Sequence, residues 1–192
     1  MKSRAELREY WKNPEPKNQP DKYINHPYRT EYLVGLFERF IDKSYSVLEV
    51  GSNVGRNLSG LWEAGYSVLT GIEINDSAVD LMYLTYPGME AFVYRMPAED
   101  MGKLGTMTEG VVFSMCVLMH IHPDSEFIFK EMARVANKYI ITIEDEVKET
   151  WRHCPRNYKE VFEPFGFEQV FEESVPWGEN GCVSRVMKRV GN

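Results

Sequence analysis

The sequence predicts an α/β protein built on one doubly wound, mostly parallel sheet, and three observations carry this prediction. Strand-like and helix-like stretches alternate from residue 45 onward. The stretch 45–61, YSVLEVGSNVGRNLSGL, has the pattern of a strand, a glycine turn and a helix. The run 181–190 and the strand expected from Phe167 together form a closing antiparallel hairpin. At 192 residues the chain is long enough for one such domain and short for two.

A helical extension is predicted ahead of the sheet. Ser3 and Glu6 have the spacing of a capping box, which starts a helix over residues 2–12. A loop rich in Pro and Asn follows, and apolar residues at helical spacing predict a second helix over residues 28–42. The expected organisation is therefore an N-terminal helical extension, residues 1–44, and a main domain, residues 45–192.

The remaining elements follow in alternation. The helix after the glycine turn is expected to end near residue 64, with Gly65 as its C-terminal glycine. A further helix is expected to be capped at Asp124 or Ser125. Its side chains expected to face the sheet are Phe127, Ile128, Met132 and Val135. The other predicted strands cover residues 67–74, 91–95, 110–116 and 139–143, and the other predicted helices cover residues 77–86 and 158–165.

The glycine turn is the first candidate ligand site. Gly51 and Gly55 permit a positive φ and bring the backbone close to a ligand, and the helix that follows presents unpaired N–H groups. Glu73 ends the next strand, where a carboxylate accepts both hydroxyls of a ribose. The dinucleotide pattern G-x-G-x-x-G is not met, because Asn53 and Arg56 stand at its second and third glycine positions. An NAD-dependent reductase is therefore the weakest interpretation.

Glu49 before the turn, Glu73 after the second strand and the AED sequence at 98–100 together resemble the class I S-adenosylmethionine (SAM) methyltransferases. The resemblance covers roughly residues 45–189. It implies a seven-stranded sheet of order 3-2-1-4-5-7-6, SAM as cofactor with S-adenosylhomocysteine (SAH) as product, and an N-terminal extension that acts as a lid. The cofactor-binding residues it implies are Glu49, Gly51, Ser52, Asn53, Gly55, Asn57, Glu73, Ile74, Ala98, Glu99 and Met115.

Two positions depart from the family pattern. Asn53 replaces the central glycine of the family, although Asn tolerates left-handed φ better than other residues with side chains. Pro97 stands where the family often has an acid, so the choice of carboxylate for the exocyclic amine of adenine stays open.

His120, at the end of the fourth strand, is the candidate catalytic residue. Relatives that act on small molecules often have a histidine here, and an ordinary pKa near 6.5 suits a proton acceptor at neutral pH. The alternative is that His120 packs and hydrogen-bonds to hold its loop. His122 is two residues further on and belongs to the same loop.

A second candidate set follows the strand at 139–143, and it begins with Glu144, Asp145 and Glu146. Carboxylates beside Trp151 suit a sugar, whose apolar face stacks on the ring. With His153 the three carboxylates could instead bind a divalent cation, or they serve as caps and solvated charge. No metal site is predicted. The predicted acceptor-side residues are Tyr28, His122, Glu144, Trp151, His153 and Arg156.

Charge and motif content narrow the acceptor. The net charge is −7 and no basic run is present, which disfavours nucleic acid. The signature [DN]-P-P-[FYW] is absent after the fourth strand, where SMCVLMH stands, and this lowers the case for methylation of a base or a glutamine amide. The preferred interpretation is a SAM-dependent methyltransferase that acts on oxygen of a small or sugar-containing acceptor. The alternatives are an RNA or protein methyltransferase and a non-catalytic SAM-binding subunit.

Location and assembly are also predicted. No apolar run has the length needed to span a membrane, and the charged N-terminus lacks an apolar signal core. The three cysteines are widely separated, as in reduced cytosolic proteins. We expect a cytoplasmic monomer or homodimer.

Overall fold

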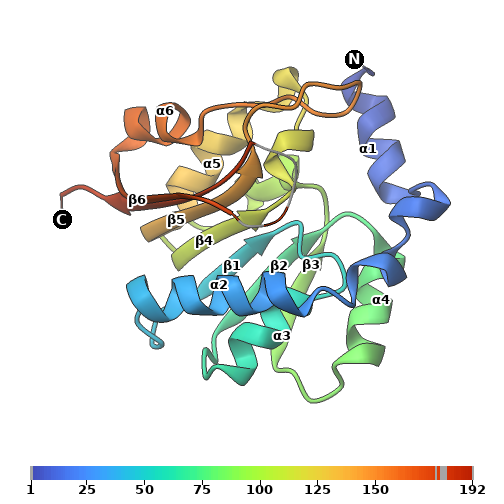
Figure 1. The fold of residues 1–192 in the computed structure, drawn as a ribbon, viewed down its shortest axis with the longest axis horizontal. Helices are drawn as coiled ribbons and strands as arrows, with labels where there is room; N and C mark the ends of the chain where they lie inside the picture. The colour runs from blue at the N-terminus through green and yellow to red at the C-terminus, as the bar shows by residue number, and fades with distance from the viewer. Residues whose placement is uncertain (1, 176, 178–180, 192) are drawn as a thin grey trace. The chain divides into compact units, whose positions relative to one another are not determined.

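The computed structural model describes residues 2–175, 177 and 181–191 (Figure 1). The strand order is β3-β2-β1-β4-β5-β7-β6, which confirms the predicted fold class and strand order. The chain divides into two compact units, and each is described by itself. Unit 2 is Arg8–Ala98, and unit 1 is Met1–Leu7 together with Glu99–Asn192. The expected division into an extension and a main domain at residue 45 stays a prediction.

Unit 2 holds the first half of the sheet. Its strands are β1 (Val47–Val50), β2 (Leu69–Glu73) and β3 (Ala91–Arg95), and its helices are α2 (Pro27–Phe40), α3 (Arg56–Glu63) and α4 (Asp76–Thr85). Two short 3-10 turns, η1 (Pro16–Asn18) and η2 (Pro20–Tyr23), precede α2. β1 pairs with β2 and β2 pairs with β3, in parallel in both cases. This is the parallel half of the predicted fold.

In unit 2, α2 packs against α3 (Figure 1). Phe37 from α2 and Leu58 from α3 are fully buried. A Cβ on Gly60 would meet the methyl group of Thr30 at 2.1 Å, so the close approach of the two helices requires a glycine there. Gly65 has a φ of 93° directly after α3, as expected for a C-terminal glycine.

The capping box at the N-terminus is confirmed. The helix α1 (Arg4–Lys12) starts two residues later than predicted. The Ser3 N–H donates to Glu6 Oε2 at 2.9 Å, and the Glu6 N–H donates to Ser3 Oγ at 3.4 Å.

Unit 1 holds the second half of the sheet. Its strands are β4 (Glu109–Met115), β5 (Ala136–Asp145), β6 (Phe167–Ser174) and β7 (Cys182–Arg189), and its α-helices are α5 (Phe127–Val135) and α6 (Tyr158–Phe162). The 3-10 turns are η3 (Ala98–Lys103), η4 (Leu118–His120), η5 (Pro123–Ser125) and η6 (Glu163–Phe165). β5 runs parallel to β4 and antiparallel to β7, which also pairs antiparallel with β6. The predicted hairpin is therefore present, with β7 inside the sheet.

The start of α5 corrects the prediction. Neither Asp124 nor Ser125 caps it, because Pro123 opens a separate 3-10 turn and α5 begins only after Glu126. This shift turns Phe127 outward, where 48% of it is exposed, while the predicted core residues Ile128, Met132 and Val135 are buried. Phe129 is the aromatic side chain that packs inward instead, at 6.0 Å from the ring of Phe162.

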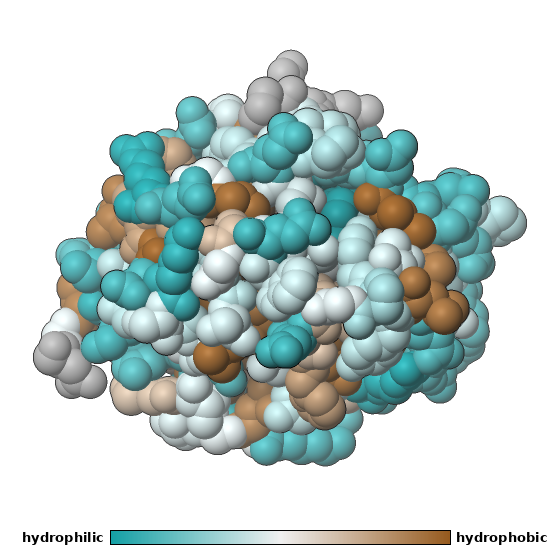
Figure 2. Space-filling model, turned by 90° about the horizontal axis from the view of Figure 1, so that it is seen from below, coloured by the Kyte–Doolittle hydropathy of each residue, from teal (hydrophilic) through white to brown (hydrophobic). Residues whose placement is uncertain are grey.

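The surface is mixed in character. On the face seen in Figure 2, apolar residues lie singly or in small groups among hydrophilic ones. Among the helices formed by the described residues, none combines the length and apolar composition that a membrane crossing needs.

Candidate active-site residues

The glycine turn between β1 and α3, residues 51–55, is named the cofactor turn here. Its backbone is left-handed at three positions, Gly51 (φ 76°), Asn53 (φ 47°) and Gly55 (φ 69°). Asn53 therefore adopts a left-handed conformation, which Asn tolerates better than other residues with side chains. The N–H groups of Gly51 and Ser52 both donate to the carbonyl of Ile72 on β2, at 2.8 and 3.0 Å. The turn is thus fixed against the neighbouring strand in unit 2.

Glu73 ends β2 and is buried, with 7% of it exposed. Its Oε2 accepts the N–H of Asn53 at 2.8 Å, and its Oε1 accepts the N–H of Asn75 at 2.8 Å. Burial raises the pKa of Glu73, and the backbone hydrogen bonds oppose that rise. A carboxylate offers about four lone-pair positions, so both backbone bonds are compatible with added ribose hydroxyls.

Glu49, on β1, has one engaged and one unengaged oxygen. Its Oε1 accepts from Asn57 Nδ2 at 2.7 Å, and the residue is only 1% exposed. Burial raises the pKa of Glu49 to about 8, against the lowering effects of Asn57 and Arg56. Among the described residues, Glu49 Oε2, Ser52 Oγ and Asn53 Oδ1 are buried without a hydrogen-bond partner.

Buried polar groups without a partner are rare because each costs free energy. Three of them belong to the cofactor turn and the strand that leads into it. Glu49 Oε2 is an acceptor suited to an ammonium group, and Ser52 and Asn53 supply a hydroxyl and an amide oxygen. The residues present therefore fit a polar ligand of the SAM type.

Arg56 ties the segment before β1 to the cofactor turn. Its Nε donates to Thr30 Oγ1 at 3.1 Å and its Nη1 donates to the Tyr23 carbonyl at 3.0 Å. Both partners come from the predicted lid, whose residues 8–44 lie in unit 2. Tyr28 lies in the same segment and is 45% exposed, with its ring edge-on to that of His26. The role of Tyr28 stays a prediction.

The remaining predicted cofactor residues are divided between the units. Ile74 and Ala98 belong to unit 2, whereas Glu99 and Met115 belong to unit 1. Ile74 and Ala98 follow β2 and β3, and Met115 ends β4. Glu99, in η3, accepts a hydrogen bond from the Ser125 hydroxyl at 3.0 Å. Ser125 is fully buried, so it fixes the orientation of the Glu99 carboxylate. Nothing in the local sequence pattern distinguished Ser125 for that position.

His120 ends η4, and its ring is fixed by a backbone partner. Nδ1 lies 3.0 Å from the carbonyl oxygen of Arg152. Because a carbonyl oxygen only accepts, Nδ1 carries the proton and Nε2 keeps the lone pair. Burial lowers the pKa of His120 to about 3, well below the ordinary value that the sequence suggested. The imidazole is therefore neutral at neutral pH.

Glu144 and Arg156, two predicted acceptor-side residues, both contact the loop that carries His120. Glu144 is fully buried and accepts from backbone N–H groups of that loop. Arg156 donates to the carbonyls of Leu118 and Ile121. The structure thus brings these two residues together with His120, within unit 1.

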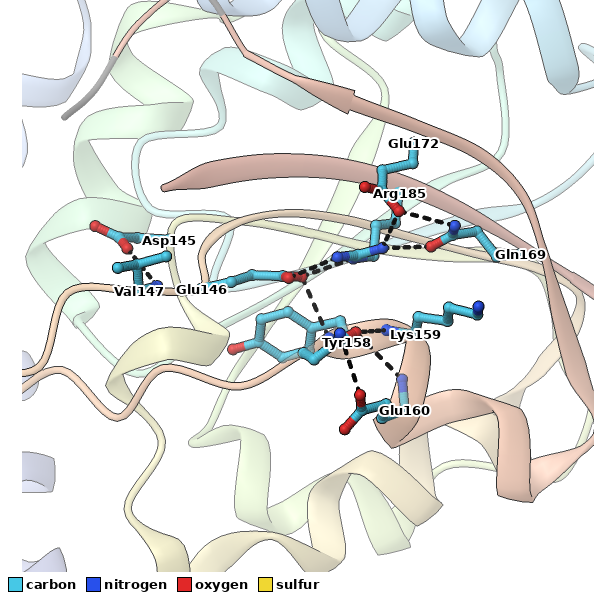
Figure 3. Close-up of polar contacts among 10 residues, drawn as sticks. Asp145, Glu146, Val147, Tyr158, Lys159, Glu160, Gln169, Glu172 and Arg185 are labelled. Carbon is cyan, nitrogen blue, oxygen red and sulfur yellow. Dashed lines mark hydrogen bonds and ion pairs between the residues drawn. The ribbon is translucent and has the colours of Figure 1, made fainter. Parts of the chain in front are cut away.

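Asp145 and Glu146 have other partners. Asp145 Oδ1 accepts the N–H groups of the next turn, at Val147 and Lys148. Figure 3 shows Glu146 directed at Arg185, whose Nε and Nη2 lie 2.8 and 2.7 Å from its two oxygens. Arg185 also contacts Gln169 and Glu172 of β6, and Glu146 accepts the N–H of Tyr158.

The three carboxylates at the end of β5 therefore point to three separate sets of partners. In the part of the chain that the structure describes, no group of three or more His, Cys, Asp or Glu side chains is arranged to hold a metal ion.

The remaining predicted acceptor-side residues lie in the loop after β5 and in η5. Trp151 is partly exposed, with Lys2 Nζ at 4.6 Å and Arg152 Cζ at 5.8 Å from its ring. The ring of His153 lies 4.7 Å from that of His120, and both of its nitrogens are buried without a hydrogen-bond partner among the described residues. His122 Nδ1 accepts the N–H of Asp124 at 3.1 Å and so caps η5.

Comparison with known proteins shows which family model and which folds this chain is similar to. Residues 48–139 match the family model described as a methyltransferase domain. No curated protein matches the chain. The matched segment covers slightly less than half of the chain, and the similar solved structures share its fold.

Three similar solved structures show the extent of the shared fold. Magnesium protoporphyrin IX methyltransferase from Synechocystis PCC 6803, solved with SAM, has a TM-score of 0.72 at 16% identity over 98% of this chain and 96% of that one. The Burkholderia thailandensis 1,6-didemethyltoxoflavin N1-methyltransferase has a TM-score of 0.73 at 13% identity over 98% and 87%. A Haloferax volcanii methyltransferase in complex with the activator Trm112 has a TM-score of 0.73 at 12% identity over 97% and 98%.

Proposed function

We propose that this protein is a SAM-dependent methyltransferase that acts on an oxygen of a small or sugar-containing acceptor. The observation that carries the proposal is the set of three buried, unpartnered polar atoms at the cofactor turn. The family match over residues 48–139 supports the same cofactor. When bound, SAM supplies an electrophilic methyl group on its sulfonium.

The proposed cofactor contacts follow from the side chains of unit 2. Glu49 Oε2 accepts from the ammonium of the methionine part, which relieves the penalty on its buried charge. Glu73 accepts the ribose hydroxyls while its two backbone bonds hold the turn. Asn53 and Ser52 bring their oxygens to the polar groups of the ligand. In unit 1, Glu99, whose carboxylate accepts from the Ser125 hydroxyl, remains the predicted partner of the adenine amine.

His120 is proposed to take the proton of the acceptor. Bound SAM would supply the methyl group to the acceptor oxygen and would leave as SAH, so the acceptor hydroxyl would have to lose its proton. Nε2 of His120 holds the lone pair that receives this proton, because Nδ1 is bonded to the Arg152 carbonyl. A base with a pKa of about 3 is weak, so positioning of the acceptor contributes more to the rate than the strength of the base.

Small acceptors are supported by two structural neighbours, which methylate a magnesium porphyrin and a toxoflavin precursor. A second candidate is a methyltransferase that needs a protein partner, because the Haloferax neighbour was solved with an activator. We place the reaction in the cytoplasm, since the three cysteines are widely separated in the sequence, as in reduced cytosolic proteins.

The test is transfer of labelled methyl groups from SAM to a panel of small hydroxylated acceptors. A methylated product is expected, and His120→Ala is expected to lower the turnover roughly a hundredfold while SAH affinity is retained. Methylation of amines alone would contradict the proposed oxygen acceptor. Methylation that appears only after a partner protein is added would favour the second candidate.

A further inference from the structure

Two side chains form hydrogen bonds with the loop 117–121, named here the His120 loop. Glu144 comes from β5, and Arg156 comes from the segment before α6. Both contact the backbone of the loop that carries His120, and Arg156 also pairs with Glu126.

The Glu144 carboxyl group accepts hydrogen bonds from backbone N–H groups of this loop. Its Oε1 accepts from the Val117 N–H at 3.1 Å and from the Ser114 hydroxyl at 2.8 Å. Its Oε2 accepts from the Met119 N–H at 3.3 Å. One carboxyl group thus holds two backbone N–H groups of the loop and a strand hydroxyl, so these contacts restrict the loop.

The Arg156 guanidinium donates hydrogen bonds to backbone carbonyls of the same loop. Its Nη2 donates to the Ile121 carbonyl at 2.9 Å, and its Nη1 lies 3.4 Å from the Leu118 carbonyl. Nη1 also donates to the Cys154 carbonyl at 2.8 Å. Next to it, the Cys154 N–H donates to the Met119 carbonyl at 2.7 Å. The loops after β4 and β5 are therefore joined by their backbones as well as by the guanidinium.

We infer that Glu144 and Arg156 are positioning residues that fix the His120 loop, and through it the His120 imidazole, rather than ligands of the acceptor. Both oxygens of Glu144 are engaged and the residue is fully buried. The Arg156 side chain is 9% exposed. The inference rests on the proposed function only in taking His120 as the residue that meets the acceptor.

Glu144→Gln tests the pair with an isosteric change. It puts an NH2 donor in place of one acceptor oxygen, and that donor then opposes a backbone N–H. The measurement is the rate at which diethyl pyrocarbonate modifies His120 in the ligand-free protein, with histidine ¹⁵N spectra to assign the ring tautomer. We expect about a tenfold faster reaction and partial loss of the Nδ1-protonated tautomer. His26, in unit 2, serves as the internal reference.

Arg156→Lys is the second variant, because it keeps the charge but loses the forked contact with the carbonyls. Its matched control is Glu126→Gln, which removes only the exposed partner of Arg156. If Glu144→Gln does not fold, Ser114→Ala removes one bond to the same carboxylate. The inference holds if the Glu144, Ser114 or Arg156 variants free His120 and Glu126→Gln does not.

A lowered melting temperature with unchanged His120 reactivity and tautomer in the folded variants would overturn the inference, since it would mean a purely structural role. The experiment uses no cofactor. Failure of the wild-type protein to bind SAH would therefore count against the proposed function and leave this result standing.

Discussion

The cofactor turn in unit 2 and the end of β5 in unit 1 differ in how their buried polar groups are used. Both carry buried carboxylates, and burial raises the pKa of Glu49 to about 8 and that of Glu144 to about 7. Glu49 leaves one oxygen without a partner, whereas both oxygens of Glu144 accept hydrogen bonds. We interpret the incomplete cluster as a ligand site and the complete one as scaffold.

The same criterion, whether a buried polar atom has a hydrogen-bond partner, also applies to His153 on the predicted acceptor side. Its two ring nitrogens are buried without partners, next to the ring of His120. Among the predicted acceptor-side residues, Glu144 and Arg156 have their polar atoms engaged in the protein. His153 therefore has the better claim to contact the acceptor.

The largest expected effect concerns Glu146, a second carboxylate at the end of β5 whose two oxygens are both engaged. Glu146→Gln weakens a buried ion pair with Arg185 (Figure 3), and we expect a loss of about 3 kcal/mol in the free energy of unfolding, measured by urea denaturation. SAH affinity in the folded variant should not change. The control Glu172→Gln removes the exposed partner of Arg185 and should cost about 1 kcal/mol or less. Normal stability together with weakened SAH binding in Glu146→Gln would mean that Glu146 belongs to a ligand site and not to the scaffold.

The next largest effect is expected on SAH affinity, from a change at Glu73 beside the cofactor turn. Glu73→Ala removes the acceptor for the Asn53 N–H and for the proposed ribose hydroxyls. We expect SAH binding to weaken by about 2–4 kcal/mol in calorimetric titration. Glu90→Ala, an exposed change next to β3, is the control. Unchanged affinity in Glu73→Ala would remove this residue from the proposed site.

A smaller effect is the release of a proton on binding. With a pKa of about 8, Glu49 is mostly protonated at pH 7 in the ligand-free protein. A cationic ammonium lowers that pKa, so SAH binding at pH 7 should release up to about one proton. Titration in buffers of different ionisation enthalpy measures this release. Glu49→Gln should abolish it, and an equal release in both proteins would exclude Glu49 as its source.

The smallest effect is on stability against pH. The pKa values of Glu49 and Glu144 are raised by folding, so between about pH 4.5 and 8 the folded state binds more protons than the unfolded state. Their contribution to stability is therefore greatest below pH 4.5 and falls as the pH rises to about 8. We expect the melting temperature of Glu49→Gln to fall less between pH 6 and pH 8 than that of the wild type. Parallel curves for the two proteins would contradict this.

The sequence predicted what depends on local pattern. The strands, the capping box at Ser3 and the left-handed backbone at Asn53 follow from short stretches, and the resemblance to a known family supplied the strand order. Phe127 was placed wrongly because Pro123 opens a separate turn that shifts the start of α5.

The positioning roles that we infer for Glu144 and Arg156 could not be predicted from a local sequence pattern. Glu144 contacts Val117, which is 27 positions away, and Arg156 contacts Ile121, which is 35 positions away. No pattern in the sequence marks such pairs. The low pKa of His120 likewise comes from burial that only the folded chain provides.

The most direct test of the central claim is calorimetric titration of the wild-type protein with SAM, SAH and NAD, repeated with an added divalent cation. We expect micromolar binding of SAM and SAH, no binding of NAD, and SAH binding that is weaker by about 2–4 kcal/mol in Glu73→Ala. Absence of SAM and SAH binding, or binding of NAD in their place, would contradict the assignment of the cofactor turn.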